Sequence, residues 1–226
     1  MANASWPLEE LTLTRNDLSA AAAGPALAAL SRLVGLRRLD VGSCMLSAAG
    51  FKALVEAAWP ALTSLCAVGA EVALDGPLML GAAAFAGLPA LEELNLQWVK
   101  LGEAGARLLS SRRWPHLRKL NLCHTLLEGT GLAALARGAW PALEELDLWG
   151  VALGEAGARL LASRRWPRLR VLCVFGCGVG DTGLAALAGG EWPALERLNL
   201  RRNQLTARLA LDDARRWAPA LVELRQ

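Results

Sequence analysis

One phrase recurs along this chain of 226 residues: Trp-Pro-x-Leu-x-x-Leu-x-Leu, or a close variant of it. Its copies begin at a set of six tryptophans, which are Trp6, Trp59, Trp114, Trp140, Trp166 and Trp192. The last four of these tryptophans are spaced 26 residues apart. A fixed period of this length is typical of stacked structural repeats, in which each unit contacts only its neighbours, and not of an ordinary globular domain.

The first leucine of the phrase sets the register of the repeats. These leucines are 26 to 29 residues apart and give eight repeats and the opening strand of a ninth: Leu8, Leu36, Leu62, Leu91, Leu117, Leu143, Leu169, Leu195 and Leu221. The alternation Leu-x-x-Leu-x-Leu predicts a short strand with one buried face. The proline ahead of it stops the preceding helix. Stretches such as 102–113 and 154–165 predict a helix after each strand, so the repeats predict an α/β solenoid.

The pattern resembles the leucine-rich repeat, whose signature is matched by Leu91, Leu94, Leu96 and their copies. Four of eight repeats carry the usual Asn or Cys at the next signature position, namely Asn16, Cys44, Cys177 and Asn203. The repeat length and the helical segment are similar to those of the ribonuclease-inhibitor-like and F-box-associated subfamilies. The resemblance implies a right-handed, horseshoe-shaped solenoid with parallel strands on the concave face and helices on the convex face. We also expect a single leucine-rich-repeat domain over residues 1–226, without end caps, as a fragment of a longer protein.

A second period lies above the first. Residues 101–117, LGEAGARLLSSRRWPHL, recur almost unchanged as residues 153–169, LGEAGARLLASRRWPRL. Repeats of two types therefore alternate, in a double unit of 52 residues. Recent tandem duplication is the simplest origin of such a pattern.

Composition narrows the possible partners and compartments. The formal net charge is only +3, from 24 basic and 21 acidic residues, which argues against nucleic acid as a partner. The five cysteines fit no disulfide framework or zinc motif, so we expect reduced thiols in an intracellular, cytoplasmic protein. No signal peptide is evident, and the longest uncharged runs, residues 18–31 and 76–91, are too short and too interrupted to span a membrane.

The sequence offers little for catalysis. His124 follows Cys123, but neighbouring strand residues point to opposite faces, and the only other histidine, His116, lies in the turn before a strand. No catalytic constellation, set of metal ligands or phosphate-binding glycine loop is recognisable. We therefore expect no catalytic residue, no metal and no cofactor in a protein that is not an enzyme.

Two repeated features favour structural roles. The tryptophan of the phrase lies between a helix end and a strand start, where we expect it to fill the rim of the core. The residue after the first leucine alternates in charge between repeats, as at Glu92, Arg118 and Glu144. In a parallel stack such residues form lateral rows, which predict ion pairs between repeats; contact with a ligand is the alternative.

Candidate binding residues follow the last leucine of each strand. Two positions there should face or rim the concave side, and large aromatic side chains cluster at Trp98, Trp149 and Phe175, next to two arginines. Exposed Trp and Arg are typical of protein interfaces. Asn and Asp between the second and third leucines should also face the concavity, where they either bond one another or bind backbone amides of a partner. The predicted partner-binding residues are Gln97, Trp98, Asn121, His124, Asp147, Trp149, Phe175, Arg201 and Arg202.

These observations predict a non-enzymatic scaffold that holds a protein partner on its concave face, with neither nucleic acid nor a membrane as partner. The resemblance implies two alternatives. One is the substrate-recognition part of an F-box-type ubiquitin ligase, although the helical F-box that should precede the repeats is missing from this sequence. The other is a regulator of an enzyme, such as a nuclease inhibitor or a GTPase activator.

Overall fold

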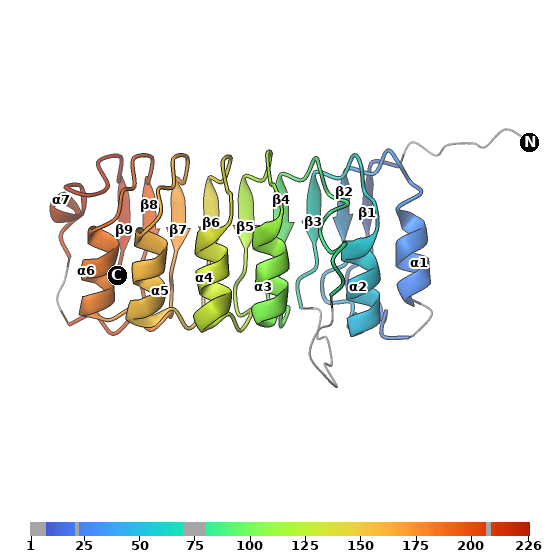
Figure 1. Cartoon of the computed structure of the whole chain (residues 1–226), viewed down its shortest axis with the longest axis horizontal. Helices are drawn as coiled ribbons and strands as arrows, with labels where there is room; N and C mark the ends of the chain where they lie inside the picture. The colour runs from blue at the N-terminus through green and yellow to red at the C-terminus, as the bar shows by residue number, and fades with distance from the viewer. Residues whose placement is uncertain (1–7, 21–22, 70–79, 207–208) are drawn as a thin grey trace, which may run out of the picture.

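Nine short parallel strands form one sheet, in which the strands keep their order along the chain (Figure 1). The structure is a computed structural model that describes residues 8–20, 23–69, 80–206 and 209–226. The strands have three residues each: β1 (Glu10–Thr12), β2 (Arg38–Asp40), β3 (Ser64–Cys66), β4 (Glu93–Asn95), β5 (Lys119–Asn121), β6 (Glu145–Asp147), β7 (Val171–Cys173), β8 (Arg197–Asn199) and β9 (Glu223–Arg225). The predicted α/β solenoid, with the opening strand of a ninth repeat, is confirmed.

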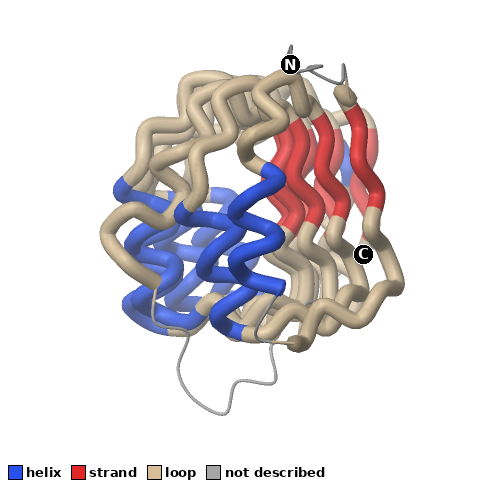
Figure 2. Tube along the Cα trace, turned by 90° about the vertical axis from the view of Figure 1, so that its right-hand side faces the viewer, coloured by secondary structure: helices blue, strands red, loops and turns tan. Residues whose placement is uncertain are grey.

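Seven helices lie in the described part of the chain: α1 (Ala23–Leu30), α2 (Ala48–Glu56), α3 (Gly102–Ser111), α4 (Gly129–Arg137), α5 (Gly154–Ala162), α6 (Asp181–Ala188) and the short α7 (Leu211–Ala214). Helices α1 to α6 cover one side of the sheet (Figures 1 and 2). The third repeat departs from the expected pattern, because residues 82–87 form turns where a helix was predicted, and residues 70–79 lie outside the described part. Among the described helices, none is long and apolar enough to cross a membrane.

The core is a stack of leucines. The middle residue of each strand is a leucine in register with the leucine of the next strand, as Leu94 is with Leu120. Leu94 is buried, whereas Glu93 and Asn95 on either side of it point to the other face of the sheet. Each repeat thus covers the leucines of its neighbour, and burying one such side chain contributes about 1.5–3 kcal/mol to stability. The strand alternation predicted from the sequence is confirmed.

The tryptophan of the repeated phrase is part of this core. It is buried in all five described copies, and each indole Nε1–H donates a hydrogen bond of 2.8–2.9 Å to a carbonyl five residues earlier: Trp59 to Leu54, Trp114 to Leu109, Trp140 to Leu135, Trp166 to Leu161 and Trp192 to Leu187. The last carbonyls of a helix lack intrahelical partners. The indole therefore closes the helix end while its rings fill the rim of the core, as expected; Trp6 lies outside the described residues.

Helix packing follows the double unit of 52 residues. Gly131 of α4 lies against α3 so closely that an added Cβ would be 3.5 Å from the Cα of Glu103. Gly183 of α6 makes the same approach to α5, at 3.4 Å from the Cα of Glu155. Between α4 and α5 the side chain of Leu132 fills the gap instead. Backbone-to-backbone contacts therefore alternate with side-chain contacts, in step with the two repeat types.

The charged rows beside the strands form ion pairs between repeats. Arg118 donates two hydrogen bonds to Glu144, at 2.9 and 3.0 Å, and Arg170 donates two to Glu196, at 2.8 and 2.9 Å. These bonds hold the pKa of the Glu144 and Glu196 carboxyls below the usual value. Lys119 bridges the glutamates of the strands on both sides. The predicted lateral pairing is confirmed, and it fixes the register of neighbouring repeats.

Candidate protein-binding edge

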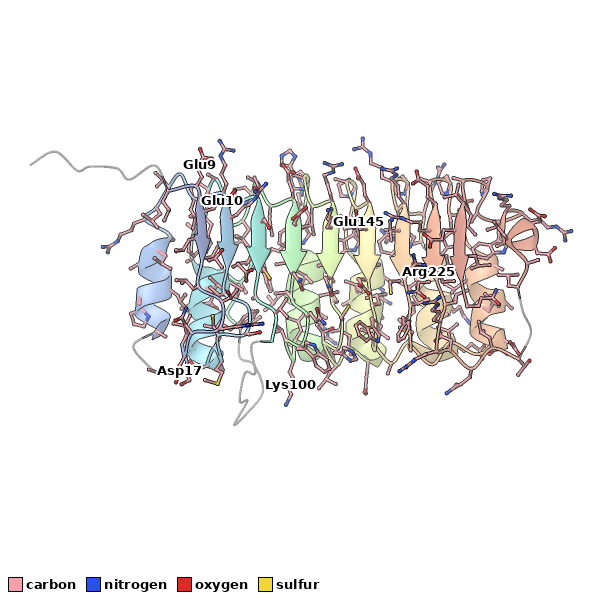
Figure 3. The ribbon with its side chains drawn as sticks, turned by 180° about the vertical axis from the view of Figure 1, so that it is seen from behind. Glu9, Glu10, Asp17, Lys100, Glu145 and Arg225 are labelled. Atoms are coloured by element: carbon pink, nitrogen blue, oxygen red, sulfur yellow. The ribbon has the colours of Figure 1, made fainter. Side chains whose placement is uncertain are left out.

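Every repeat turns sharply just beyond its strand. The third residue after each of the first eight strands has a positive φ, between 54° and 69°: Arg15, Ser43, Gly69, Trp98, His124, Gly150, Gly176 and Arg202. This left-handed conformation is strained for a residue with a side chain. The turns line the edge at which the strands end, which Asp17 and Lys100 mark in Figure 3.

Aromatic rings from four consecutive repeats form a continuous row along this edge. The imidazole of His124 stacks on the indole of Trp98, with ring centroids 3.9 Å apart and planes inclined by 7°. Trp149 meets His124 edge-on at 5.1 Å, and Phe175 meets Trp149 edge-on at 5.3 Å. The guanidinium carbon of Arg202 lies 5.6 Å from the centre of the Phe175 ring, within the range of a cation–π contact. We call these five residues the aromatic row.

The aromatic row is open to solvent, whereas the leucine core beneath it is fully buried. Trp98 is 51% exposed and Trp149 is 41% exposed, while His124 and Phe175 are half-buried. A ring pair of this geometry is worth about 0.5–1.5 kcal/mol beyond the area that it buries. The contacts therefore order the side chains against one another and leave their outer surfaces uncovered.

Glycine provides the space that the row needs. Gly150 lies beneath His124, where an added Cβ would be only 2.2 Å from the imidazole Cε1. In the sixth and seventh repeats glycine takes the left-handed position, and the aromatic side chain comes from the residue before it, Trp149 or Phe175. In the fourth and fifth repeats the aromatic residue itself, Trp98 or His124, has the left-handed backbone conformation. Glycine thus replaces the aromatic residue at the left-handed position in the sixth and seventh repeats, and the space at Gly150 lets the His124 ring contact Trp149.

Polar side chains at the last strand position hold these turns. Oδ1 of Asp147 accepts a hydrogen bond of 3.1 Å from the backbone N–H of Trp149, and Oδ1 of Asn121 accepts one of 2.9 Å from Cys123. The same bond recurs in the fourth and eighth repeats. The sequence suggested either lateral bonding or contact with a partner for this row of residues. The structure shows a third role, since one oxygen of each fixes the turn that carries the aromatic row.

A shallow groove runs beside the aromatic row on the face of the sheet turned away from the helices, which we call the strand face (Figure 3). It has a volume of about 260 Å³ and extends from β4 to β7. Polar side chains line it, among them Asn121, Glu145 and Asp147. Asn121 and Asp147, which fix the turns of the aromatic row, thus also line this groove.

The thiols near this surface are not activated. Burial raises the pKa of Cys173 and of Cys177 to about 12, and burial followed by the charge of Asp147 raises the pKa of Cys123 as well. Such thiols stay protonated at neutral pH, whereas the thiolate is the nucleophile. No hydrogen bond joins Cys123 to His124 among the described contacts. Within the described ranges, no three His, Cys, Asp or Glu side chains are grouped to hold a metal ion.

The structure brings most of the predicted binding residues together. Five of them make up the aromatic row, and Asn121 and Asp147 line the adjoining groove. Gln97 is half-buried and Arg201 is exposed, and each is the chain neighbour of a residue of the row. Sequence reasoning missed Gly150, although a glycine one repeat beyond His124, at the same turn position, was a visible signal.

Comparisons with known proteins agree with this fold. Residues 168–188, in the seventh repeat, match the family described as Leucine Rich repeat. No curated protein has a matching sequence. The chain is similar to one in the crystal structure of the Rad7 and Elc1 complex in yeast, with 14% identity and a TM-score of 0.54, over 89% of this chain and 52% of that one. It therefore spans about half the length of that chain.

A second similar structure is that of a leucine-rich repeat protein of Leptospira interrogans, with 15% identity and a TM-score of 0.41, over 96% of this chain and 66% of that one. The segment that matches the family is one of a series of repeats with the same leucine pattern, and these repeats build a single parallel sheet. By its sequence motif and by its fold, the chain is a leucine-rich repeat solenoid.

Proposed function

We propose that the chain is a non-enzymatic scaffold that binds a protein partner through the aromatic row and the adjoining groove of the strand face. The observation that carries this proposal is the exposure of Trp98 and Trp149 in an ordered row. Exposed aromatic patches of this kind mark interaction sites, and Trp and Arg dominate the energy of protein interfaces. Rings that are held in place before binding lose little conformational entropy when a partner covers them.

The chemistry of the surface supports a binding role over a catalytic one. The thiols beside the row have raised pKa values, and His124 is engaged by two indoles and not by a nucleophile. One of the similar solved structures is a complex of two proteins, which is consistent with this use of the fold. The F-box and enzyme-regulator alternatives would place a different partner on the same surface, so one experiment serves all three.

The proposal is tested by affinity purification of the intact chain from a lysate of its own cells, followed by mass spectrometry. Trp98→Ala combined with Trp149→Ala should reduce recovery of the specific partner at least about tenfold, as expected when interface hot spots are removed. The matched control replaces Leu126 and Met45 by alanine, because these exposed apolar side chains lie outside the aromatic row. Circular dichroism checks that both variants fold. Equal recovery by the tryptophan variant and the control would refute the proposal.

A further inference from the structure

The alternating charges of the strand face are interrupted at Ser64 and again at Val171. The first residue of each strand forms a lateral row in which acidic and basic side chains alternate through Glu93, Lys119 and Glu145. The next residue in this row is Val171, an uncharged side chain where the alternation calls for a basic residue. Arg197, which follows Val171, therefore lacks an acidic neighbour on that side. On its other side Glu223 is paired with Arg225.

Arg197 is consequently an exposed cation without an ion pair among the described residues, unlike the basic residues that continue the ladder in earlier repeats. It borders a second groove of about 140 Å³ on the strand face of β7 to β9, which Val171, Glu223 and Arg225 also line (Arg225 is labelled in Figure 3). The nearest carboxylates are those of Glu196 and of Glu223, which is in register with Arg197, and they form ion pairs with Arg170 and Arg225. The guanidinium of Arg197 is therefore available to an anionic ligand.

The eighth repeat adds a second exposed cation close to this face. Side chains alternate along β8, so Arg197 and Asn199 point to the strand face while Leu198 is buried. Arg201 lies in the turn just beyond the strand, at the position that Trp149 and Phe175 take in their repeats. Arg201 is exposed and also has no ion pair among the described residues. We call Arg197 and Arg201 the arginine pair of the eighth repeat.

The arginine pair lies next to the end of the aromatic row. Arg202, the neighbour of Arg201, makes the cation–π contact to Phe175 in the preceding repeat. Adjacent strands are about 4.8 Å apart, so Arg201, which has the same turn position as Phe175 and Trp149, lies roughly 5–10 Å along the solenoid from them. Arg197 lies about 13 Å back along the strand from Arg201. An extended peptide advances about 3.3 Å per residue. The distance from Arg201 to the two rings corresponds to about two to three peptide residues.

We propose that the scaffold takes an acidic segment of its partner, in which an Asp or Glu lies within about three residues of a large apolar side chain. The apolar side chain covers Trp149 and Phe175, and the carboxylate pairs with Arg197 and Arg201. This inference rests on the proposed function and adds the chemistry of the partner. Arginine suits the task, since its planar guanidinium binds a carboxylate through two parallel hydrogen bonds.

The charges around the aromatic row favour a peptide over a single-stranded nucleic acid. Bases can also stack on aromatic rings while cations hold phosphates. A nucleic-acid strand that followed this row would, however, carry its phosphates past three carboxylates in the adjoining groove, those of Glu93, Glu145 and Asp147, against one cation, Lys119. Like charges at this distance oppose binding, whereas a peptide bears its negative charge only at chosen positions. The acidic groups thus restrict the anionic part of the ligand to the eighth repeat.

The test is selection of displayed random short peptides on the intact chain, followed by fluorescence anisotropy with the selected peptides. We expect Asp or Glu near a large apolar residue in those peptides. Arg197→Glu with Arg201→Glu should weaken their binding at least about tenfold and make it less sensitive to salt. Arg113→Glu with Arg168→Glu is the matched control, because these exposed arginines undergo the same charge change at the opposite edge. The control should change affinity less than about threefold.

The remaining outcomes separate the two proposals. Peptides that depend on Trp149 but lack acidic residues, or that bind the Arg197/Arg201 variant equally well, overturn the acidic-segment inference and leave the proposed function standing. Selection of no acidic peptide overturns the inference in the same way. Peptides that bind the Trp98/Trp149 variant as tightly as the unmodified chain overturn both proposals. If a single-stranded oligouridine binds more tightly than the selected peptides, and this binding is lost in the Arg197/Arg201 variant, the inference is overturned in favour of nucleic acid.

Discussion

At the scale of single residues, the candidate site depends on what occupies the left-handed turn of each repeat. Two aromatic residues, Trp98 and His124, adopt this backbone conformation despite its cost of about 1–2 kcal/mol for a residue with a side chain. Their stacking at 3.9 Å offsets part of that cost. Glycine at the next two turns, Gly150 and Gly176, avoids it and leaves room for the rings that come from the preceding residues.

A side chain at Gly150 would both strain the backbone and clash with His124, and a matched variant separates these two effects. Gly178 has nearly the same φ, 68° against 69°, but nothing lies within 4 Å of an added Cβ. We expect Gly178→Ala to cost about 1 kcal/mol through backbone strain alone, and Gly150→Ala to cost about 1–3 kcal/mol more because the methyl displaces His124. Urea denaturation measures both, and equal losses would contradict the contact.

The displacement itself can be read from the two histidines. In the unmodified chain the ring protons of His124 should be shifted upfield by the stacked indole of Trp98, while those of the exposed His116 serve as an internal reference. Gly150→Ala should remove most of that shift and Gly178→Ala should not. Proton NMR provides this measurement, and a His124 signal that stays in place would show that the methyl is accommodated in another way.

At the scale of the elements, helices pair through glycine in step with the double unit. An alanine methyl at Gly131 of α4 would meet Glu103 and Ala106 of α3 at 3.5 Å, which is an ordinary van der Waals contact. We expect Gly131→Ala to stabilise the fold by about 0.5–1 kcal/mol, because glycine inside a helix costs about that much conformational entropy. Gly131→Leu should destabilise by about 1–3 kcal/mol, since it must push the two helices apart. Thermal unfolding measures the change in stability of both variants, and changes of the same sign would contradict the close helix packing inferred at Gly131.

The elements also show how far sequence reasoning reaches. Strand positions could be predicted because Leu-x-x-Leu-x-Leu fixes both the period and the buried face, and the pairing of Leu94 with Leu120 follows from it. The structure of the third repeat could not be predicted, because residues 82–87 form turns within a run of small residues that is also compatible with a helix. For the site, the repeat spacing alone placed Trp98, Trp149 and Phe175 in equivalent turns of the fourth, sixth and seventh repeats. That His124 joins them depends on ring orientations and on the space at Gly150, which no period encodes.

At the scale of the whole molecule, each repeat is held only by its neighbours, so stability is close to a sum over repeats and interfaces. Thiols are distributed along this stack and are partly or fully buried in every case. Burial raises the pKa of Cys66 to about 11 and of Cys173 and Cys177 to about 12. In the unfolded chain a thiol has a pKa of about 8.5. The unfolded state therefore loses these protons at a lower pH than the folded state does.

This difference predicts that the solenoid weakens in alkali. The stabilising contribution of each thiol is complete below a pH of about 8.5, and it is lost progressively as the pH rises towards 11 to 12. Each thiol should lower the free energy of unfolding by up to about 1.4 kcal/mol per pH unit in this range. Urea denaturation at a series of pH values measures the slope. Replacing Cys66, Cys173 and Cys177 by alanine should flatten it whatever the replacement does to stability at neutral pH, because only an ionisable group couples folding to protons. An unchanged slope would show that other groups, such as Lys119 with its raised pKa, govern the alkaline transition instead.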